Sequence, residues 1–354
     1  MHDCWEAHAA VLGGGRVQDR AWVIEKASVG RYRPDVLALR ERPLAELAEG
    51  ELRVRTLLLS LDPSNLVWLK LLPGWMEEVH VGDVMKGPSL GVVEQSRHPD
   101  FATGDLVSGA LDWRLRSNVP AAAVLPLRRL PGVPLEAHLS IFSHVGRAAM
   151  IGMTMVGRVR PGDVVLVSGA AGATGSLACQ IALAAGAQVV GIAGGAVKCA
   201  WLLDELGLDA AIDYRADDLD AALARACPDG FDMMFDNVGG ATLDTALMHL
   251  KVGARVAICG AISSYSDAAP SDVYRHANLF QLLMKRARIE GFVVPDFEDH
   301  YEALDSALAV LIRRGALEAR IHMLDGLEAA ADGLELLLTG GNHGKLLVRV
   351  SDLN

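Results

Sequence analysis

The sequence is poor in aromatic residues and has more acidic than basic side chains. Phe, Trp and Tyr make up 5% of the 354 residues, and the formal net charge is −11. Surfaces that bind nucleic acids combine basic side chains with stacking aromatic rings, and anionic membranes attract Lys and Arg. The composition therefore argues against a nucleic acid or an anionic membrane as a partner.

Closely spaced cysteines, which often mark zinc sites, are also missing. The five cysteines form no Cys-x-x-Cys motif, and the histidines at 80, 98, 138 and 144 show no ligand spacing. We therefore expect no metal site. Cys179, Cys199 and Cys259 lie in apolar stretches, which predicts buried free thiols and fits a reducing compartment.

A secretory signal is not evident, because the first residues lack a basic segment followed by an apolar one. Residues 164–197 carry no Asp, Glu, Lys or Arg and are long enough to span a bilayer. They contain seven glycines, however, and their apolar periodicity changes twice, which favours a buried β-α-β unit over a membrane helix. We expect a cytoplasmic protein that does not enter the membrane.

The chain is long enough for two domains, and its patterning changes near residue 138. Residues 1–137 show short apolar runs between turn signals, which predicts a small β-barrel-type domain. Within residues 138–313, a helix at 138–157 precedes strands that alternate with helices, a pattern typical of a doubly wound parallel sheet. Residues 314–354 hold a helix at 327–339 and a strand at 346–350 that is expected to return to the first domain. The expected α/β elements are strands at 164–168, 188–193, 210–214, 233–237 and 255–260, and helices at 174–185, 197–206, 219–226 and 242–249.

The central motif is Ser-Gly-Ala-Ala-Gly-Ala-Thr-Gly at residues 168–175, between an expected strand and an expected helix. It matches the dinucleotide fingerprint Gly-x-Gly-x-x-Gly with Ala170 in the first glycine position. Gly172 would let the backbone approach a pyrophosphate, and Gly175 would let the helix pack closely. Ala173 and Thr174 would present free N–H groups at the helix N-terminus, where anions bind.

The next strand indicates which dinucleotide is bound. NAD-binding units usually end this strand in Asp or Glu, which holds the ribose 2′-hydroxyl. Here it ends in Ala-Gly-Gly at 193–195, and no carboxylate follows until Asp204. Lys198 lies where a cation could meet a 2′-phosphate. The sequence therefore predicts NADP(H) as the cofactor.

Short strings distributed in order over nearly the whole chain resemble one family, the zinc-independent medium-chain dehydrogenase/reductases. The most similar branch contains the prostaglandin reductases, leukotriene hydroxydehydrogenases and plant double-bond reductases. The strings are LLSLDP (58–63), RHPDF with GDLVSG (97–109), SGAAGATGS (168–176), VVGIAGG with KCAWL (189–202), AIDY (211–214), FDNVGG (235–240), ICGAISSY (258–265), KRARIEGF (285–292) and NHGK (342–345).

The resemblance implies a GroES-like barrel domain, closed by the C-terminal segment, beside a Rossmann domain, with the active site in the cleft between them. Family members use NADPH to reduce the carbon–carbon double bond of α,β-unsaturated ketones or aldehydes. They are often dimers joined through the Rossmann sheet edge. For this chain we therefore expect a small-molecule substrate and a homodimer, with strands at 255–260 and 288–294 at the interface.

The resemblance also assigns site residues. Tyr265 matches the tyrosine that faces the substrate carbonyl, so it or the cofactor's ribose hydroxyl would stabilise the enolate, and water could deliver the final proton. Lys198 and Tyr214 would meet the adenosine phosphate end, Asn237 and Gly239 would lie near the nicotinamide, and Asn342 would close over the cofactor. The full expected cofactor set is Ala170, Gly172, Ala173, Thr174, Gly175, Gly194, Lys198, Tyr214, Asn237, Cys259, Gly260, Ala261, Ile262 and Asn342.

Three segments that border the substrate in the family depart from its pattern, at residues 64–66, 85–89 and 146–150. Substrate identity should therefore not be inherited. Ser64, Asn65, Arg147 and Met150 are the candidate pocket residues, although Arg147 could equally be a helix-surface arginine. Two alternatives stay open: a quinone reductase on the same fold, and a nucleotide-binding or scaffold protein without catalysis.

Overall fold

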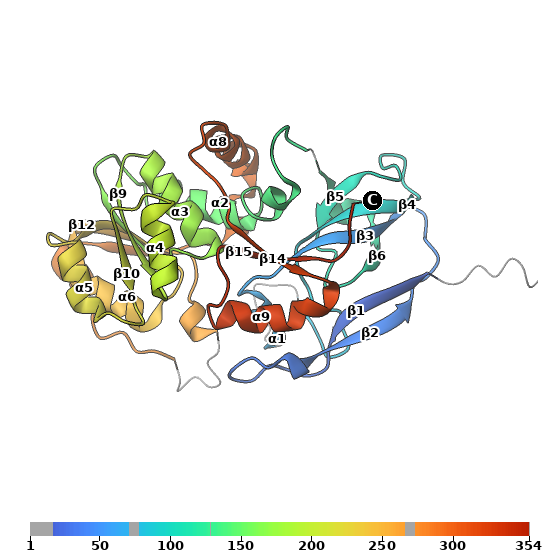
Figure 1. The fold of residues 1–354 in the computed structure, drawn as a ribbon, viewed down its shortest axis with the longest axis horizontal. Coiled ribbons are helices and arrows are strands. Elements are labelled where there is room, and N and C mark those ends of the chain that lie inside the picture. Colours follow the sequence, from blue (N-terminus) through green and yellow to red (C-terminus); the bar gives the residue numbers. More distant parts are fainter. Residues whose placement is uncertain (1–16, 71–77, 128, 266–272, 354) are drawn as a thin grey trace, which may run out of the picture.

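The computed structural model describes residues 17–70, 78–127, 129–265 and 273–353. Figure 1 shows two lobes, with the C-terminal segment running between them. One lobe is a six-stranded parallel sheet with helices on both faces, and the other is built around antiparallel strands. The predicted fold class is therefore confirmed. The predicted domain boundaries at 137 and 313 stay a prediction.

The antiparallel lobe contains a two-stranded and a seven-stranded sheet. The larger sheet has the order β14-β15-β3-β4-β5-β7, with β6 also paired to β3. One short helix, α1 (Asn65–Leu69), follows β3. The strands of this lobe are β1 (Gln18–Ile24), β2 (Leu37–Pro43), β3 (Glu51–Ser60), β4 (Ser89–Ser96), β5 (Leu106–Gly109), β6 (Arg116–Pro120) and β7 (Val124–Pro126).

The parallel sheet has the order β10-β9-β8-β11-β12-β13. The inner strands β8, β9 and β11 are mostly buried, and since successive side chains of a strand point to opposite faces, their neighbouring residues pack against opposite helix layers. In β8, Val165 and Val167 pack with α3 and α4, whereas Leu166 packs with α5 and α6. The strands are β8 (Val164–Ser168), β9 (Gln188–Ala193), β10 (Ala210–Asp213), β11 (Phe231–Asp236), β12 (Leu250–Ile258) and β13 (Arg288–Gly291).

Three helices of this lobe, α3, α4 and α5, begin and end within two residues of their predicted limits, as is usual for helix ends. Helix α6 begins two residues and ends three residues before its predicted limits, and α7 and α8 were not predicted. The uncharged stretch 164–197 forms β8, α3 and β9, as predicted. In the part of the chain that the structure describes, no helix is long and apolar enough to cross a membrane. The helices are α2 (His144–Met150), α3 (Ala173–Ala184), α4 (Ala196–Asp204), α5 (Leu219–Ala226), α6 (Gly240–Ala246), α7 (Phe280–Lys285) and α8 (Tyr301–Arg313).

Three predicted elements were wrong in their limits, and one of them, the strand expected at 288–294, ends at Gly291 as β13. The helix expected at 138–157 begins only at His144, where the Ser143 hydroxyl accepts a hydrogen bond from the Val145 N–H. Before it, the chain folds back so tightly that a Cβ on Gly146 would lie 2.0 Å from the Ile141 carbonyl oxygen. After Met150 the helix continues as a π-helical turn, Ile151–Val156. The strand expected at 255–260 runs from Leu250 to Ile258 instead.

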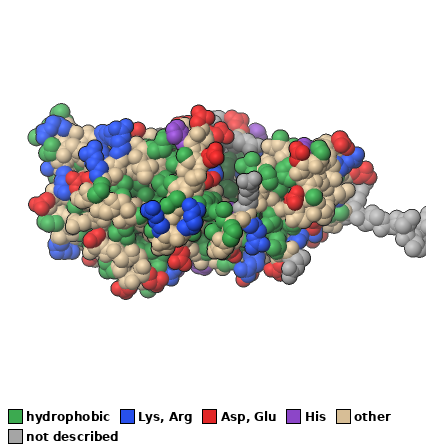
Figure 2. Space-filling model, turned by 90° about the horizontal axis from the view of Figure 1, so that it is seen from above, with side chains coloured by type: hydrophobic (Ala, Val, Ile, Leu, Met, Phe, Trp, Pro, Cys, Tyr) green, Lys and Arg blue, Asp and Glu red, His purple; other side chains and the backbone are tan. Residues whose placement is uncertain are grey.

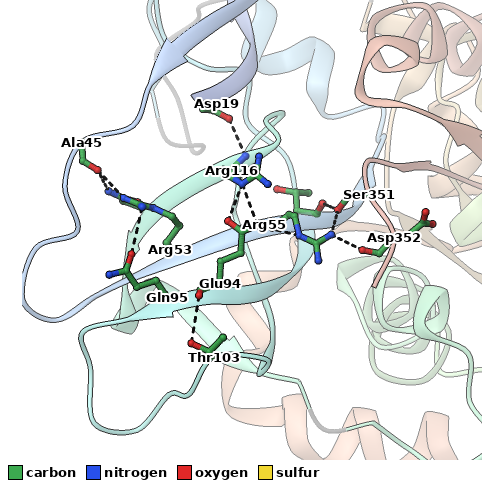
Figure 3. Close-up of polar contacts among 12 residues, drawn as sticks. Asp19, Ala45, Arg53, Arg55, Glu94, Gln95, Thr103, Arg116, Ser351 and Asp352 are labelled. Atoms are coloured by element: carbon green, nitrogen blue, oxygen red, sulfur yellow. Dashed lines mark hydrogen bonds and ion pairs between the residues drawn. The ribbon is translucent and has the colours of Figure 1, made fainter. Parts of the chain in front are cut away.

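The C-terminal segment joins the two lobes. It contains β14 (Ile321–Asp325), α9 (Ala330–Leu338) and β15 (Lys345–Arg349). β15 pairs antiparallel with β3, so the terminal strand joins the sheet of the first lobe, as predicted. Figure 3 shows the Arg55 guanidinium of β3 donating to the Ser351 hydroxyl and to the Asp352 carbonyl, which holds the end of the chain against the barrel.

Candidate active site

The glycine-rich turn between β8 and α3 leaves the N-terminus of α3 without a side-chain cap. A Cβ on Gly175 would lie 2.2 Å from the Gly169 carbonyl oxygen, so only glycine fits there. A Cβ on Gly172 would meet that oxygen at 3.1 Å and nothing else within 4 Å. The first-turn N–H groups, at Ala173 and Thr174, can therefore hold an anion, because free N–H groups and the helix dipole both favour negative charge there.

Ala170, which occupies the position of the first glycine in the motif, anchors this turn to the neighbouring strand β9. It is fully buried, its N–H donates to the Ile192 carbonyl, and its methyl lies against Gly191. The Ala170 N–H is therefore not free for a phosphate, and the place of this residue in the cofactor site stays a prediction.

Two cations converge beside the end of β9. Lys198 Nζ donates to the Gly340 carbonyl at 3.0 Å, and Arg215 Nη2 donates to the Thr339 carbonyl at 2.9 Å. Burial and the neighbouring Arg215 lower the pKa of Lys198. Tyr214 is half exposed beside them, and its ring would lie 2.8 Å from a Cβ on Gly194. These groups can bind a dianion, since two like charges held close together gain from an anion between them.

Arg215 is the site residue that the sequence reading missed. The sequence feature that could have identified Arg215 is a basic residue directly after Tyr214, just beyond the strand β10 that pairs with β9. The nearest acid, Asp213, is already used, because its carboxylate accepts from the N–H groups of Gly195 and Arg215.

Asp236, at the end of β11, positions the chain segments 237–239 and 259–262, which lie beside the glycine-rich turn; we call the surface between them the groove. It is fully buried and accepts hydrogen bonds from the Ser168 hydroxyl and from the N–H groups of Val238 and Gly239. Burial raises its pKa despite these bonds. Its own carbonyl accepts from the N–H groups of Cys259 and Gly260, which turns the chain out of β12 two residues earlier than predicted.

The neighbouring predicted residues lie along this turn. Asn237 Nδ2 donates to the Ser168 carbonyl at 2.7 Å, so the side chain ties β11 to β8. Gly239 has a φ of +69°, which favours glycine, and its carbonyl accepts from the Leu243 N–H in α6. Burial raises the pKa of the Cys259 thiol to about 12, so it stays protonated. The structure thus brings Asn237, Gly239 and residues 259–262 together.

Tyr265 lies at the junction of the two lobes. It follows β12, yet its ring packs against the apolar cluster of the first lobe that contains Leu66 of α1 and Leu334 of α9. Its hydroxyl accepts a long hydrogen bond, 3.4 Å, from the Ala261 N–H. Burial raises the pKa of Tyr265, so the hydroxyl keeps its proton near neutral pH. A protonated hydroxyl that is already an acceptor can still donate to a ligand.

Asn342 is buried in the loop that connects α9 to β15. Its Nδ2 donates to the Gly344 carbonyl, and the Gly344 N–H donates to the Ala171 carbonyl at 3.1 Å. The loop therefore lies against the glycine-rich turn through Gly344, whereas the Asn342 amide stabilises the loop itself. Seen from above in Figure 2, a recess with hydrophobic side chains in its wall opens between the lobes.

The structure gives three of the four pocket candidates other roles. Asn65 is fully buried: its Oδ1 accepts from the Asp62 N–H and its Nδ2 donates to the Lys86 carbonyl. Arg147 forms a bidentate pair with Asp305 of α8, at 2.9 and 2.7 Å, and lies 4.2 Å over the Tyr301 ring. Met150 is buried in the core of the parallel lobe. Ser64, half-buried at the start of α1, is the candidate that remains.

No group of three or more His, Cys, Asp or Glu side chains that could hold a metal ion occurs within the described residues. The cysteines at 179, 199 and 227 are buried and free, and Cys259 is free and half-buried. Cys4 lies outside the described residues. The prediction of buried thiols is therefore confirmed for Cys179 and Cys199.

The structure combines a lobe of antiparallel strands with a parallel sheet whose glycine-rich turn leaves a helix N-terminus uncapped, and Tyr265 lies between the two. This combination is typical of oxidoreductases that bind a dinucleotide cofactor. A family model described as the N-terminal domain of oxidoreductase matches residues 20–127, and one described as a zinc-binding dehydrogenase matches residues 173–309.

Similar proteins extend over nearly the whole chain. An NADPH-dependent curcumin reductase of Escherichia coli is 32% identical over 96% of this chain and 99% of its own. A 2-alkenal reductase (NADP(+)-dependent) of Nicotiana tabacum is 36% identical, covering 84% and 87%. The crystal structure of CurA from Vibrio vulnificus in complex with NADPH superposes with a TM-score of 0.89 at 32% identity, covering 94% and 99%. The chain belongs to the zinc-independent branch of the medium-chain dehydrogenase/reductase family, and the resemblance stated from the sequence is confirmed.

Proposed function

We propose that this protein uses NADPH to reduce the carbon–carbon double bond of an α,β-unsaturated ketone or aldehyde. The observation that carries the proposal is the placement of Tyr265. Its protonated hydroxyl lies at the junction of the lobes, next to the groove formed by Asp236, Asn237 and residues 259–262. The relatives named as curcumin and 2-alkenal reductases support the same chemistry.

The cofactor is NADP(H). We propose that the uncapped N-terminus of α3 holds its pyrophosphate, and that Lys198, Arg215 and Tyr214 hold the 2′-phosphate. The two cations donate to backbone carbonyls, and a dianion would be a stronger acceptor for both. Asn237 and Gly239 would border the nicotinamide, with Cys259, Gly260, Ala261 and Ile262 along the groove.

The chain's contribution to the chemistry is electrostatic. When bound, NADPH supplies the hydride that reaches the substrate's β-carbon. Negative charge then develops on the carbonyl oxygen, and a donor aimed at that oxygen stabilises the transition state more than the ground state. We assign this donor role to the Tyr265 hydroxyl; the alternative donor would be a ribose hydroxyl of the cofactor. Water delivers the proton to the α-carbon.

The direct test is product analysis with deuterium at the transferable position of NADPH. The protein is assayed against a panel of enones, enals and quinones. Deuterium on the β-carbon of a saturated carbonyl product supports the proposal. Deuterium on the carbonyl carbon, or turnover of quinones alone, would replace it with another reductase activity, and no turnover across the panel would leave a nucleotide-binding protein.

We further propose that the protein is a homodimer joined at the free edge of the parallel sheet. β13 is the edge strand, and Ile289 on it is 36% exposed. Phe280, Leu283 and Met284 of the preceding α7 are 54–68% exposed, so an apolar surface adjoins the outer edge of β13, which pairs with no other strand than β12 among the described residues. Such an edge invites pairing with a second chain. Light scattering at low micromolar concentration tests this: wild type should be a dimer and Leu283→Asp a monomer.

A further inference from the structure

A buried ion pair, with the half-exposed His144 beside it, joins three separate parts of the chain. Asp62, 5% exposed, follows β3 in the first lobe. Its Oδ1 accepts from Lys345 Nζ of β15 at 2.5 Å and lies 3.3 Å from His144 Nε2 at the start of α2. Its Oδ2 accepts from the Ser60 hydroxyl. The carboxylate therefore links the first lobe, the C-terminal segment and the parallel lobe.

Each end of the ion pair continues into a part of the active site. On one side, Lys345 follows Gly344, whose N–H donates to the Ala171 carbonyl in the glycine-rich turn. On the other side, the Asp62 N–H donates to Asn65 Oδ1, and Asn65 Nδ2 donates to the Lys86 carbonyl. A continuous set of bonds thus runs from the phosphate turn to α1, the wall of the first lobe that carries Ser64 and Leu66.

The electrostatics favour an ionised Asp62 carboxylate, whereas burial lowers the pKa of Lys345 although the attraction of Asp62 opposes that shift. Burial alone would raise the pKa of the Asp62 carboxyl, but Lys345 and His144 outweigh it and hold that pKa well below its usual range. Lys345 is 2% exposed, and Nζ also donates to the Leu61 carbonyl at 3.1 Å. Buried pairs of this kind add little net stability, because desolvation cancels most of the attraction. Their geometric demand is strict, which suits a positioning role.

We propose that Asp62, Lys345 and His144 are positioning residues that couple cofactor binding at the loop 340–345 to the placement of the wall at residues 62–70. The proposal rests on the proposed function only in calling this wall the substrate side. When the loop closes on the cofactor, β15 carries Lys345 with it, and the ion pair holds the Asp62–Asn65 turn in one position. Residues 62–70 therefore adopt their final position before the unsaturated carbonyl compound binds.

Hydrogen–deuterium exchange on the full chain, with and without NADPH, tests the coupling. In wild type, NADPH should slow exchange about fivefold or more both at 340–345 and at 62–70, since exchange reports local opening. In Asp62→Asn/Lys345→Met, which removes both charges and so leaves neither buried without a partner, only the loop should be slowed. His144→Leu keeps the ion pair and should reduce the effect at 62–70 by about half.

The matched control is Arg349→Met, which removes the exposed pair with Asp325 from the same strand and should behave as wild type. Equal slowing at 62–70 in the double variant, or none there in wild type, would overturn the coupling. Kinetics give a second readout: the double variant should lose about tenfold in kcat with an unsaturated carbonyl, while its Kd for NADPH stays within about threefold. A wild type that shows the coupling but reduces no such compound would refute the proposed function and leave the network standing.

Discussion

The cofactor side and the substrate side of the groove are built in different ways. On the cofactor side, the backbone sets the geometry: glycines admit close approach, and the Asp236 carbonyl accepts from the N–H groups of Cys259 and Gly260 at the end of the neighbouring strand. On the substrate side, side chains set it, and Asn65 and Arg147 are already bonded to other parts of the protein. The position of a glycine-rich turn can therefore be predicted from the sequence motif alone. The role of a polar side chain such as Asn65 or Arg147 depends on which residues it contacts in the folded protein.

The largest expected effect is at Gly175. A Cβ would lie 2.2 Å from a backbone oxygen that cannot move freely, so Gly175→Ala should cost about 3 kcal/mol of local stability. NADPH binding should weaken about 100-fold. Gly172→Ala is the graded partner, because its Cβ would meet the same oxygen at 3.1 Å. It should fold as wild type and bind NADPH about tenfold more weakly. Equal affinities for both variants, by fluorescence titration, would contradict backbone control.

Next in size is the loss of the Tyr265 hydroxyl. Tyr265→Phe keeps the ring against the first lobe but removes the donor, so kcat for enone reduction should fall tenfold or more, with ~10²-fold an upper expectation. The Kd for NADPH should not change. Tyr301→Phe is the control, since that hydroxyl donates to the Val294 carbonyl in the parallel lobe. An unchanged rate for Tyr265→Phe with a good substrate would remove this residue from the mechanism.

The cation pair should decide between NADPH and NADH. Lys198→Ala and Arg215→Ala each remove a charge-assisted donor worth ~1.5–3 kcal/mol, so each should weaken NADPH about tenfold or more. NADH, which lacks the 2′-phosphate, should bind as before. Arg225→Ala, at an exposed site on α5, controls for the change in net charge. A parallel loss of NADH affinity would mean that the two cations act on the fold rather than on the phosphate.

The smallest expected effect is that of Arg147→Met, which tests whether this side chain is structural or belongs to the substrate pocket. Arg147→Met should lower the free energy of unfolding by about 1 kcal/mol, because it breaks a half-buried bidentate pair between α2 and α8. The KM for the unsaturated substrate should stay within about twofold. Thermal unfolding and steady-state kinetics measure both quantities. A KM raised tenfold would restore Arg147 as a pocket residue.

Much of the fold followed from local patterns. Alternating apolar strands and helices predicted the parallel sheet, and the terminal strand without a local partner predicted a return to the first domain. The structure shows that this strand, β15, pairs there with β3. The start of α2 was not predictable, because it depends on the close approach of Gly146 to Ile141 and on a cap by Ser143. The end of β12 depends likewise on the Asp236 carbonyl in the adjacent strand.

The sequence by itself determined the phosphate turn, the missing acid, the cation at Lys198 and the tyrosine at 265. Each of these features depends only on residue type and on neighbours a few positions away. A tight turn requires glycine, and a strand end lacks an acid, whatever the rest of the chain does. Only the tertiary structure decided that Arg215 joins Lys198, that Asn65, Arg147 and Met150 are used internally, and that Asp62 meets Lys345. Those outcomes depend on contacts between residues up to 283 positions apart, and no local pattern encodes them.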